Sequence, residues 1–260
     1  MKLMKLICLC AAMLVSAHPI FAADNPWFGT WKLNFNKSTL TGNTVTVGKI
    51  PNGYHFDLGA VKYDVFEDGQ DHSTVGNRTE SLKSTGKHEW LRVYKVDGKE
   101  VGRATLRLSE DGTKLTEDIT GTDADGSTYS QHVTLERADS RPDLAGTWKQ
   151  TKAAFSARLL MVYSETDGGK WKVETPSSHS VIVFSLDGTP ASESGPRAIA
   201  DETYAYTKVS DTELKYTIFE KGVPYAEGTE TVSTDGKMLK DVSWLTVKPA
   251  EKEIDVWEKQ

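Results

Sequence analysis

Few side chains in this chain of 260 residues have the types and spacing that catalysis or metal binding requires. The histidines after residue 23 lack the close spacing of a metal site and occur singly, at His55, His72, His88, His132 and His179. Neither a Gly-x-Ser-x-Gly elbow nor a phosphate-binding glycine loop occurs. Glu117 and Asp118 are adjacent, so on a strand they point to opposite faces, and we interpret them as solvated charge. The sequence predicts no catalytic residue, metal site or cofactor, although catalysis by residues that only the fold brings together stays open.

Aromatic side chains are the residues whose spacing does suggest a site. They form pairs two or four residues apart, which places both members on one face of a β-strand. The candidate ligand-binding residues are Tyr54, Phe56, Trp90, Tyr94, Tyr204, Tyr206 and Tyr216. Such faces line either a solid core or a cavity for an apolar or amphipathic molecule, with phenolic hydroxyls fixing its polar end. The sequence leaves both possibilities open.

The composition excludes several classes of protein. There are 31 Lys and Arg against 37 Asp and Glu, and a net charge of −6 gives no field that would hold a nucleic acid. A hydrophobic fraction of 38% with 26% charged residues is typical of a soluble globular protein. Charges such as Arg92, Arg103 and Arg107 interrupt the expected strands, so we do not expect the chain to span a membrane.

The first 23 residues have the composition of a signal peptide. Lys2 and Lys5 precede an apolar run over residues 6–15, and Ile20-Phe21-Ala22 offers a cleavage site. The run is too short for a transmembrane helix. We therefore expect residues 1–23 to be removed and the protein to be periplasmic or secreted. Both cysteines lie in this segment, so the mature chain would have no disulfide.

The rest of the chain contains two copies of one unit. Gly-Thr-Trp-Lys at residues 29–32 recurs at 146–149, and residues 89–115 align without a gap with residues 213–239, at a spacing of 124. Each copy closes on similar residues, Leu-Glu-Arg at 135–137 and Trp-Glu-Lys at 257–259. A short polar stretch with Pro142 separates them. We expect two domains, residues 24–139 and 143–260, that fold as separate units.

Strand signals dominate both copies. Trp31, Leu33 and Phe35 alternate with polar residues, which is the period of a half-buried strand. Asp-Gly turns follow at short intervals, among them Asp97-Gly98, Asp111-Gly112 and Asp235-Gly236, and they predict antiparallel hairpins. The fold class is therefore all-β, and each copy has room for about eight strands in a sandwich or a barrel.

Gly-Thr-Trp-Lys on the first strand, the series of hairpins and a cation on the last strand together resemble the lipocalin-like domains of the calycin group. The resemblance implies two tandem antiparallel β-barrels. It also implies that an indole closes one end of each barrel while a late Arg or Lys packs across it. By position these pairs are Trp31 with Arg137, and Trp148 with Lys259. The middle-strand signature of the best-known secreted lipocalins is absent.

Three functions fit these observations. We prefer a non-catalytic exported protein that sequesters a small hydrophobic or amphipathic molecule inside a β-barrel. An isomerase or hydrolase that acts on such a molecule, and a structural protein of the cell envelope, are the alternatives. The volume of any cavity would distinguish the structural role from the other two, and a cluster of buried titratable groups inside it would favour the enzyme over the binding protein.

Overall fold

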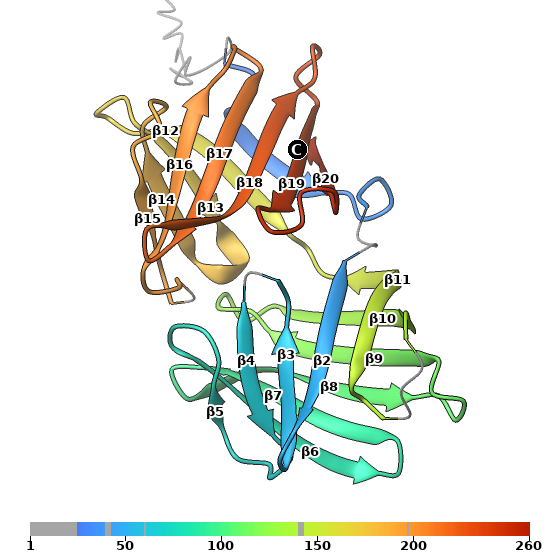
Figure 1. Ribbon diagram of the computed structural model, residues 1–260. Helices are drawn as coiled ribbons and strands as arrows, with labels where there is room; N and C mark the ends of the chain where they lie inside the picture. Colours follow the sequence, from blue (N-terminus) through green and yellow to red (C-terminus); the bar gives the residue numbers. More distant parts are fainter. Residues whose placement is uncertain (1–24, 40–42, 60, 140–142, 197) are drawn as a thin grey trace, which may run out of the picture.

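The computed structural model describes residues 25–39, 43–59, 61–139, 143–196 and 198–260 (Figure 1). In these ranges all the strands pair antiparallel, and the one helical element is a short turn, η1 (Pro176–Ser178). The predicted all-β fold class is therefore confirmed. The predicted signal peptide, residues 1–23, lies outside the described residues.

The strands form two ten-stranded sheets, which we call barrel 1 and barrel 2 (Figure 1). Barrel 2 is closed by backbone pairing all the way round. Its strands are, in order, β1 (Gly29–Leu33), β12 (Leu160–Glu165), β13 (Trp171–Thr175), β14 (Ser180–Phe184), β15 (Ala191–Ser194), β16 (Glu202–Lys208), β17 (Glu213–Glu220), β18 (Val223–Val232), β19 (Met238–Leu245) and β20 (Glu253–Lys259).

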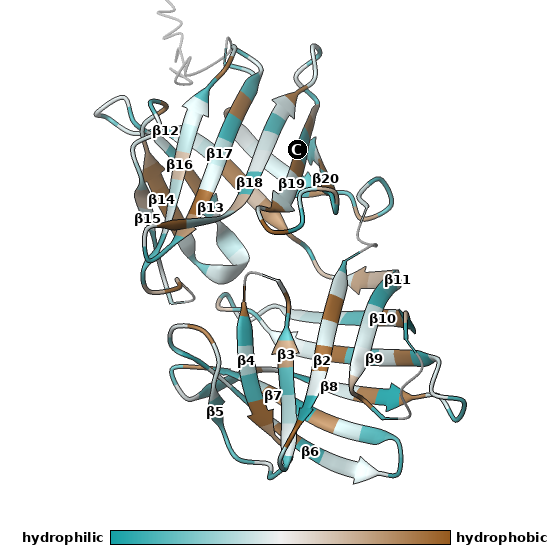
Figure 2. Ribbon diagram, in the orientation of Figure 1, coloured by the Kyte–Doolittle hydropathy of each residue, from teal (hydrophilic) through white to brown (hydrophobic). Residues whose placement is uncertain are grey.

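Barrel 1 is curved in the same way, but its two edge strands are not paired with each other. Its strands are, in order, β4 (Lys62–Phe66), β3 (Gly53–Asp57), β2 (Thr44–Ile50), β11 (Gly146–Ser156), β10 (Thr128–Arg137), β9 (Lys114–Thr122), β8 (Lys99–Leu108), β7 (Glu89–Val96), β6 (Arg78–Gly86) and β5 (His72–Ser73). Buried and exposed residues alternate along strands such as β8 and β10. Figure 2 shows hydrophobic and hydrophilic residues in bands along the ribbons.

The hairpin turns confirm that the two copies fold alike. Asp97 and Gly98, between β7 and β8, have φ angles of 50° and 73°. Lys221 and Gly222 occupy the same place between β17 and β18, with φ angles of 50° and 79°. Positive φ at both central residues is the requirement of a two-residue type I′ turn, which matches the twist of the flanking strands.

The first strand of each copy belongs to the barrel of the other copy. Strand β1 pairs with β12 and β20 of barrel 2, whereas β11 pairs with β10 and β2 of barrel 1. The expectation that each Gly-Thr-Trp-Lys strand joins the barrel of its own copy is therefore wrong. Both copies carry Gly-Thr-Trp-Lys on this strand, so the alternation of side chains does not indicate which barrel each strand joins.

The barrels face each other with the ends opposite to their first-strand tryptophans. In barrel 1 the turn at Gly112, just before β9, lies at the same end as Arg137, whose Nε donates to the Gly112 carbonyl oxygen. Strand β9 runs from this turn to its connection with β10 at the opposite end of the barrel. There the Asp125 N–H donates to the Ser177 carbonyl oxygen of barrel 2 at 3.2 Å. At the same joint Lys248 Nζ of barrel 2 donates to the Thr44 carbonyl oxygen at 3.0 Å. We call these facing ends the mouths of the barrels.

Candidate functional site

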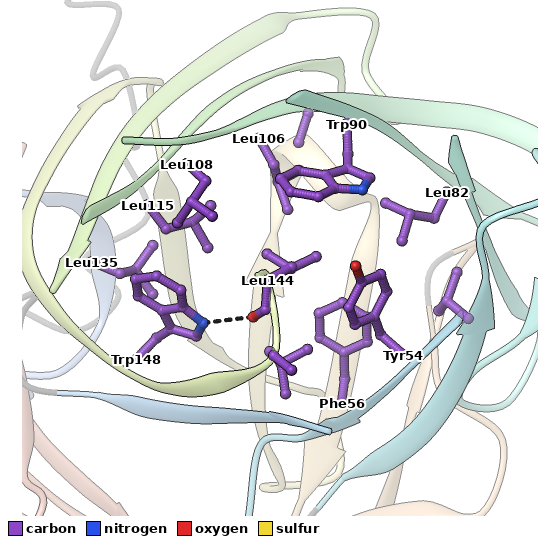
Figure 3. Close-up of a cluster of buried hydrophobic side chains, with 14 of the residues drawn as sticks. Tyr54, Phe56, Leu82, Trp90, Leu106, Leu108, Leu115, Leu135, Leu144 and Trp148 are labelled. Atoms are coloured by element: carbon purple, nitrogen blue, oxygen red, sulfur yellow. Dashed lines mark hydrogen bonds between the residues drawn. The ribbon is translucent and has the colours of Figure 1, made fainter. Parts of the chain in front are cut away.

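Each barrel is closed at the end away from its mouth by a tryptophan and a cation. In barrel 1 Arg137 Cζ lies 4.1 Å from the ring centre of Trp148, and Trp148 Nε1 donates to the Leu144 carbonyl oxygen at 2.9 Å (Figure 3). In barrel 2 Lys259 Nζ lies 4.9 Å from the ring centre of Trp31. A cation over an indole contributes about 0.5 to 2 kcal/mol. The cation therefore adds to the link between the last strand and the first-strand tryptophan of each barrel.

The partners in these pairs differ from the expected ones. The resemblance pairs Trp31 with Arg137 and Trp148 with Lys259, whereas the structure pairs Trp148 with Arg137 and Trp31 with Lys259. The exchange of first strands is the cause, because the register places Trp148 opposite Arg137 and Trp31 opposite Lys259. The four residues are the predicted ones, but each pair joins the two copies.

A cavity of about 430 Å³ occupies barrel 1 and reaches its mouth. Its wall is mostly aliphatic and aromatic, with Val47, Phe56, Leu106, Leu115, Val133 and Leu135 among its lining residues. Figure 3 shows Phe56, Leu106, Leu115 and Leu135 arranged around the interior of this barrel. Residues of barrel 2 cover the mouth, so the cavity is bounded by both barrels.

The guanidinium group of Arg92 is the buried cation of this cavity. Its Nε donates to Glu80 Oε2 at 2.7 Å, and its Nη2 donates to the same oxygen and to Tyr63 Oη, both at 2.5 Å. The three side chains come from β7, β6 and β4, so they connect β4 to β6 where the backbone pairing of barrel 1 is interrupted. Arg92 Cζ also lies 4.5 Å from the ring centre of Phe56.

Glu117 on β9 is a second polar group in the wall of the same cavity. Burial raises the pKa of its carboxyl group above the ordinary value, and the nearby charge of Arg92 offsets only part of this effect. Its neighbour Asp118 faces outward and accepts a hydrogen bond from Arg107 Nη1 at 2.6 Å. The prediction that the two carboxylates point to opposite faces is confirmed, but the interpretation of Glu117 as solvated charge is wrong.

A second cavity, of about 220 Å³, lies at the mouth of barrel 2. Tyr216, Ile218, Ala226, Trp244 and Ser243 contribute to its wall. The residues that line both cavities are Asn43, Leu245, Lys248, Glu251 and Glu253. The two cavities therefore adjoin at the joint between the barrels.

Deeper in barrel 2 lie two buried carboxyl groups. Tyr163 Oη donates to both oxygens of Glu230, at 2.9 and 2.7 Å, and Tyr216 Oη donates to Asp241 Oδ1 at 3.0 Å. Burial raises the pKa of Glu230 to about 8 and that of Asp241 to about 7. At the spacing of 124 residues, the counterpart of Glu230 in barrel 1 is Leu106. The interiors of the two barrels therefore differ in chemistry.

The predicted ligand-binding residues of the first copy lie together in barrel 1, at different depths. Phe56 lines the cavity. Tyr54 and Trp90 belong to the buried core beside it (Figure 3). Tyr94 packs against this core, with Arg92 Cζ 5.1 Å from its ring centre. Of these four, only Phe56 forms part of the cavity wall.

The predicted residues of the second copy lie in barrel 2. Tyr216 lines the smaller cavity. Tyr206 stacks on Phe184 with ring centres 4.1 Å apart, and the Tyr204 hydroxyl donates to Glu202. The seven predicted aromatic residues thus divide between two barrels and do not form one site. Their role in binding stays a prediction.

The sequence interpretation missed Arg92 and Glu117 because both are charged. Arg92 lies two residues from Trp90 and two from Tyr94, so the alternation that selected those aromatics also places Arg92 on the inner face. Glu117 lies two residues from Leu115 and two from Ile119, in the same relationship. The sequence did contain a signal for burial of these two residues: each has large apolar residues at both i−2 and i+2.

Among the residues that the structure describes, no group of three or more His, Cys, Asp or Glu side chains is placed to hold a metal ion. In the same residues, no helix has the length and apolar character needed to cross a membrane.

No protein family, curated protein or solved structure matches the chain. The function proposed below rests on the geometry and chemistry of the two cavities.

Proposed function

We propose that this protein binds a small hydrophobic or amphipathic molecule in the cavity of barrel 1. One observation carries the proposal: a space of about 430 Å³, walled mainly by apolar side chains, also holds the polar groups of Arg92 and Glu117. Ligand cavities in proteins commonly measure about 300 to 1,000 Å³ and combine apolar walls with a few polar groups. Burial of the apolar part of the ligand would supply most of the affinity.

The polar part of the ligand is an uncharged hydrogen-bonding group. Glu80 already neutralises Arg92, so an added carboxylate would have no unpaired cation to meet. Arg92, which donates through Nε and Nη2 to Glu80 and Tyr63, lines the cavity, so its guanidinium group is a hydrogen-bond donor in the wall. Glu117 offers an acceptor or, when protonated, a donor. An amide, alcohol or ketone suits this pair of groups.

We propose that the protein is exported and that its domains are lipocalin-like. The composition of residues 1–23 supports export to the periplasm or the medium. The barrel-like sheets, each closed by a tryptophan and a cation, support a lipocalin-like interpretation. Sequestration of an apolar molecule outside the cytoplasm is the function that joins these properties.

One observation favours an enzyme as the second candidate. Glu117 lines the cavity near Arg92 and has a raised pKa, which is a property of many general acids and bases. Glu230 and Asp241 also have raised pKa values, but they do not line either cavity. An isomerase or hydrolase of the bound molecule would therefore depend on Glu117.

Native mass spectrometry of the protein purified from its natural source tests the proposal. We expect an added mass from one small apolar or amphipathic molecule for each chain. The released molecule, added back, should raise the melting temperature in a concentration-dependent way and should be recovered unchanged. Conversion of the molecule by wild type, abolished in Glu117→Gln, would establish the enzyme instead. Absence of any bound molecule, together with no thermal response to a panel of long-chain amides, alcohols and isoprenoids, would contradict both.

A further inference from the structure

The joint between the barrels separates two apolar spaces by a polar belt. The larger space is the cavity of barrel 1, and the smaller one is the cavity of about 220 Å³ at the mouth of barrel 2. The belt consists of four polar residues that line both spaces, Asn43, Lys248, Glu251 and Glu253. A molecule that passed from one cavity into the other would cross this belt.

Lys248 and Glu251 form an ion pair within the belt. Lys248 Nζ donates to Thr44 Oγ1 at 2.8 Å and lies 4.0 Å from Glu251 Oε2. The Thr44 hydroxyl in turn donates to Glu251 Oε1 at 3.0 Å. Asn43 forms a hydrogen bond with the carboxyl group of Glu253. Lys248 is already paired with Glu251, so an anionic group in the belt would lack a countercharge, and burial disfavours the charged form of Glu253. A neutral, hydrogen-bonding group therefore suits the belt better than an anion.

The smaller space suits an aromatic or short aliphatic group. A cavity of about 150 Å³ in a protein core is known to hold benzene, so 220 Å³ is sufficient for a phenyl ring. Ile218, Ala226 and Leu245 supply its aliphatic contacts, and Tyr216 and Trp244 its aromatic ones. Tyr216 is held in place by its hydrogen bond to Asp241 at 3.0 Å.

We propose that the two cavities form one chamber for a single ligand with two apolar ends and a neutral polar segment between them. The longer apolar part occupies barrel 1, the amide-like or ester-like segment lies at the belt, and a phenyl-sized end enters barrel 2. This inference rests on the proposed function and specifies its ligand. In this proposal the exchange of first strands has a role, because it keeps the two mouths together.

Calorimetric titration with two amides tests the inference. Decanamide has only the long chain and the amide, whereas N-benzyldecanamide adds a phenyl end. In wild type we expect the benzyl group to increase the affinity about tenfold or more, as the burial of one aromatic side chain would. In Ala226→Leu, which fills the smaller cavity, we expect this gain to fall below about threefold while the affinity for decanamide stays within about twofold.

Matched variants make the result specific. Ser243→Leu fills the same cavity from another strand, and Ala154→Leu makes the same chemical change as Ala226→Leu at an exposed position of β11. Ser243→Leu should behave as Ala226→Leu does, and Ala154→Leu as wild type does. Binding of decanamide without a benzyl gain in wild type, or a gain that survives both filling variants, would overturn the single chamber and leave the proposed function intact. If neither amide binds, both the single chamber and the proposed function are overturned.

Discussion

Arg137, on the last strand of the first copy, lies with its Cζ 4.1 Å from the ring centre of Trp148, on the first strand of the second copy. The same guanidinium donates from Nη1 to the Ala145 carbonyl oxygen at 2.7 Å and from Nε to the Gly112 carbonyl oxygen at 2.5 Å. The contact therefore joins the two copies within one barrel. Separating the copies in the segment between them would remove a strand from each barrel.

Replacement of Trp148 tests the exchange of first strands. Trp148 is fully buried, so Trp148→Ala should lower the free energy of unfolding by about 3 to 5 kcal/mol. Hydrogen exchange should show the loss of protection mainly in residues 44–137, because Trp148 packs in barrel 1. The reciprocal variant Trp31→Ala should affect residues 160–259. Losses confined to the copy that carries the substitution would show that the strands are not exchanged.

Much of the fold could be predicted from the sequence, for physical reasons. Alternation of apolar residues and Asp-Gly turns specify antiparallel hairpins, and the repeat implies two similar barrels. The partner of each first strand could not be predicted, because Gly-Thr-Trp-Lys and a terminal cation occur in both copies. Which barrel each strand joins is decided by pairing between distant segments, and the local sequence pattern does not specify that pairing.

The site could be predicted only in part. Aromatic spacing selected Phe56 and Tyr216, which line the two cavities. Tyr54 and Trp90 have the same spacing but pack in the core, because spacing defines a face and not the depth along it. Arg92 was missed because its burial depends on Glu80 and Tyr63, which lie on other strands.

The buried ion pair of barrel 1 gives a second prediction. The side chains of Arg92 and Glu80 are only 9% and 12% exposed, so Arg92→Met should lower the free energy of unfolding by about 3 to 5 kcal/mol. The cause is the unpaired carboxylate of Glu80, and the double variant with Glu80→Gln should recover much of the loss. Urea unfolding measures these differences.

Arg107 provides the control for this prediction. It pairs with Glu89 at 2.9 Å, but its side chain is 50% exposed. Arg107→Met should therefore cost far less stability, because solvent screens an exposed pair. Equal losses for Arg92→Met and Arg107→Met would mean that burial does not make the Arg92–Glu80 pair more important for stability than the exposed pair.

The carboxyl groups of barrel 2 predict a pH dependence of stability. Folding raises the pKa of Glu230 to about 8 and that of Asp241 to about 7, from ordinary values near 4. Between these limits the folded state binds more protons than the unfolded chain, so the free energy of unfolding should fall as the pH rises from about 4 to about 8. Glu230→Gln, with its hydrogen bond to Tyr163 retained, should flatten this dependence. A stability that rises from pH 5 to pH 8 in wild type would contradict the prediction.

A disulfide across the mouths tests whether ligand exchange requires the barrels to part. The Asp125 N–H and the Ser177 carbonyl oxygen are 3.2 Å apart, which brings the two residues close enough for Asp125→Cys and Ser177→Cys to bond. With the cysteines oxidised, association and dissociation of decanamide should slow by about tenfold or more, and reduction should restore both rates. The single variants Asp125→Cys and Ser177→Cys are the controls, because neither can form this disulfide. Unchanged rates in the oxidised protein would show that ligands enter by another route.

The most direct measurement is the affinity of barrel 1 for decanamide before and after its cavity is filled. Val133 lines the cavity, whereas Val183, on β14, is 41% exposed, so Val133→Phe and Val183→Phe make the same change inside and outside a barrel. With circular dichroism confirming that both variants are folded, calorimetry should show one site and a negative heat-capacity change in wild type and in Val183→Phe. In Val133→Phe the affinity should fall by about tenfold or more. Equal affinity in Val133→Phe and wild type would contradict a binding site inside barrel 1.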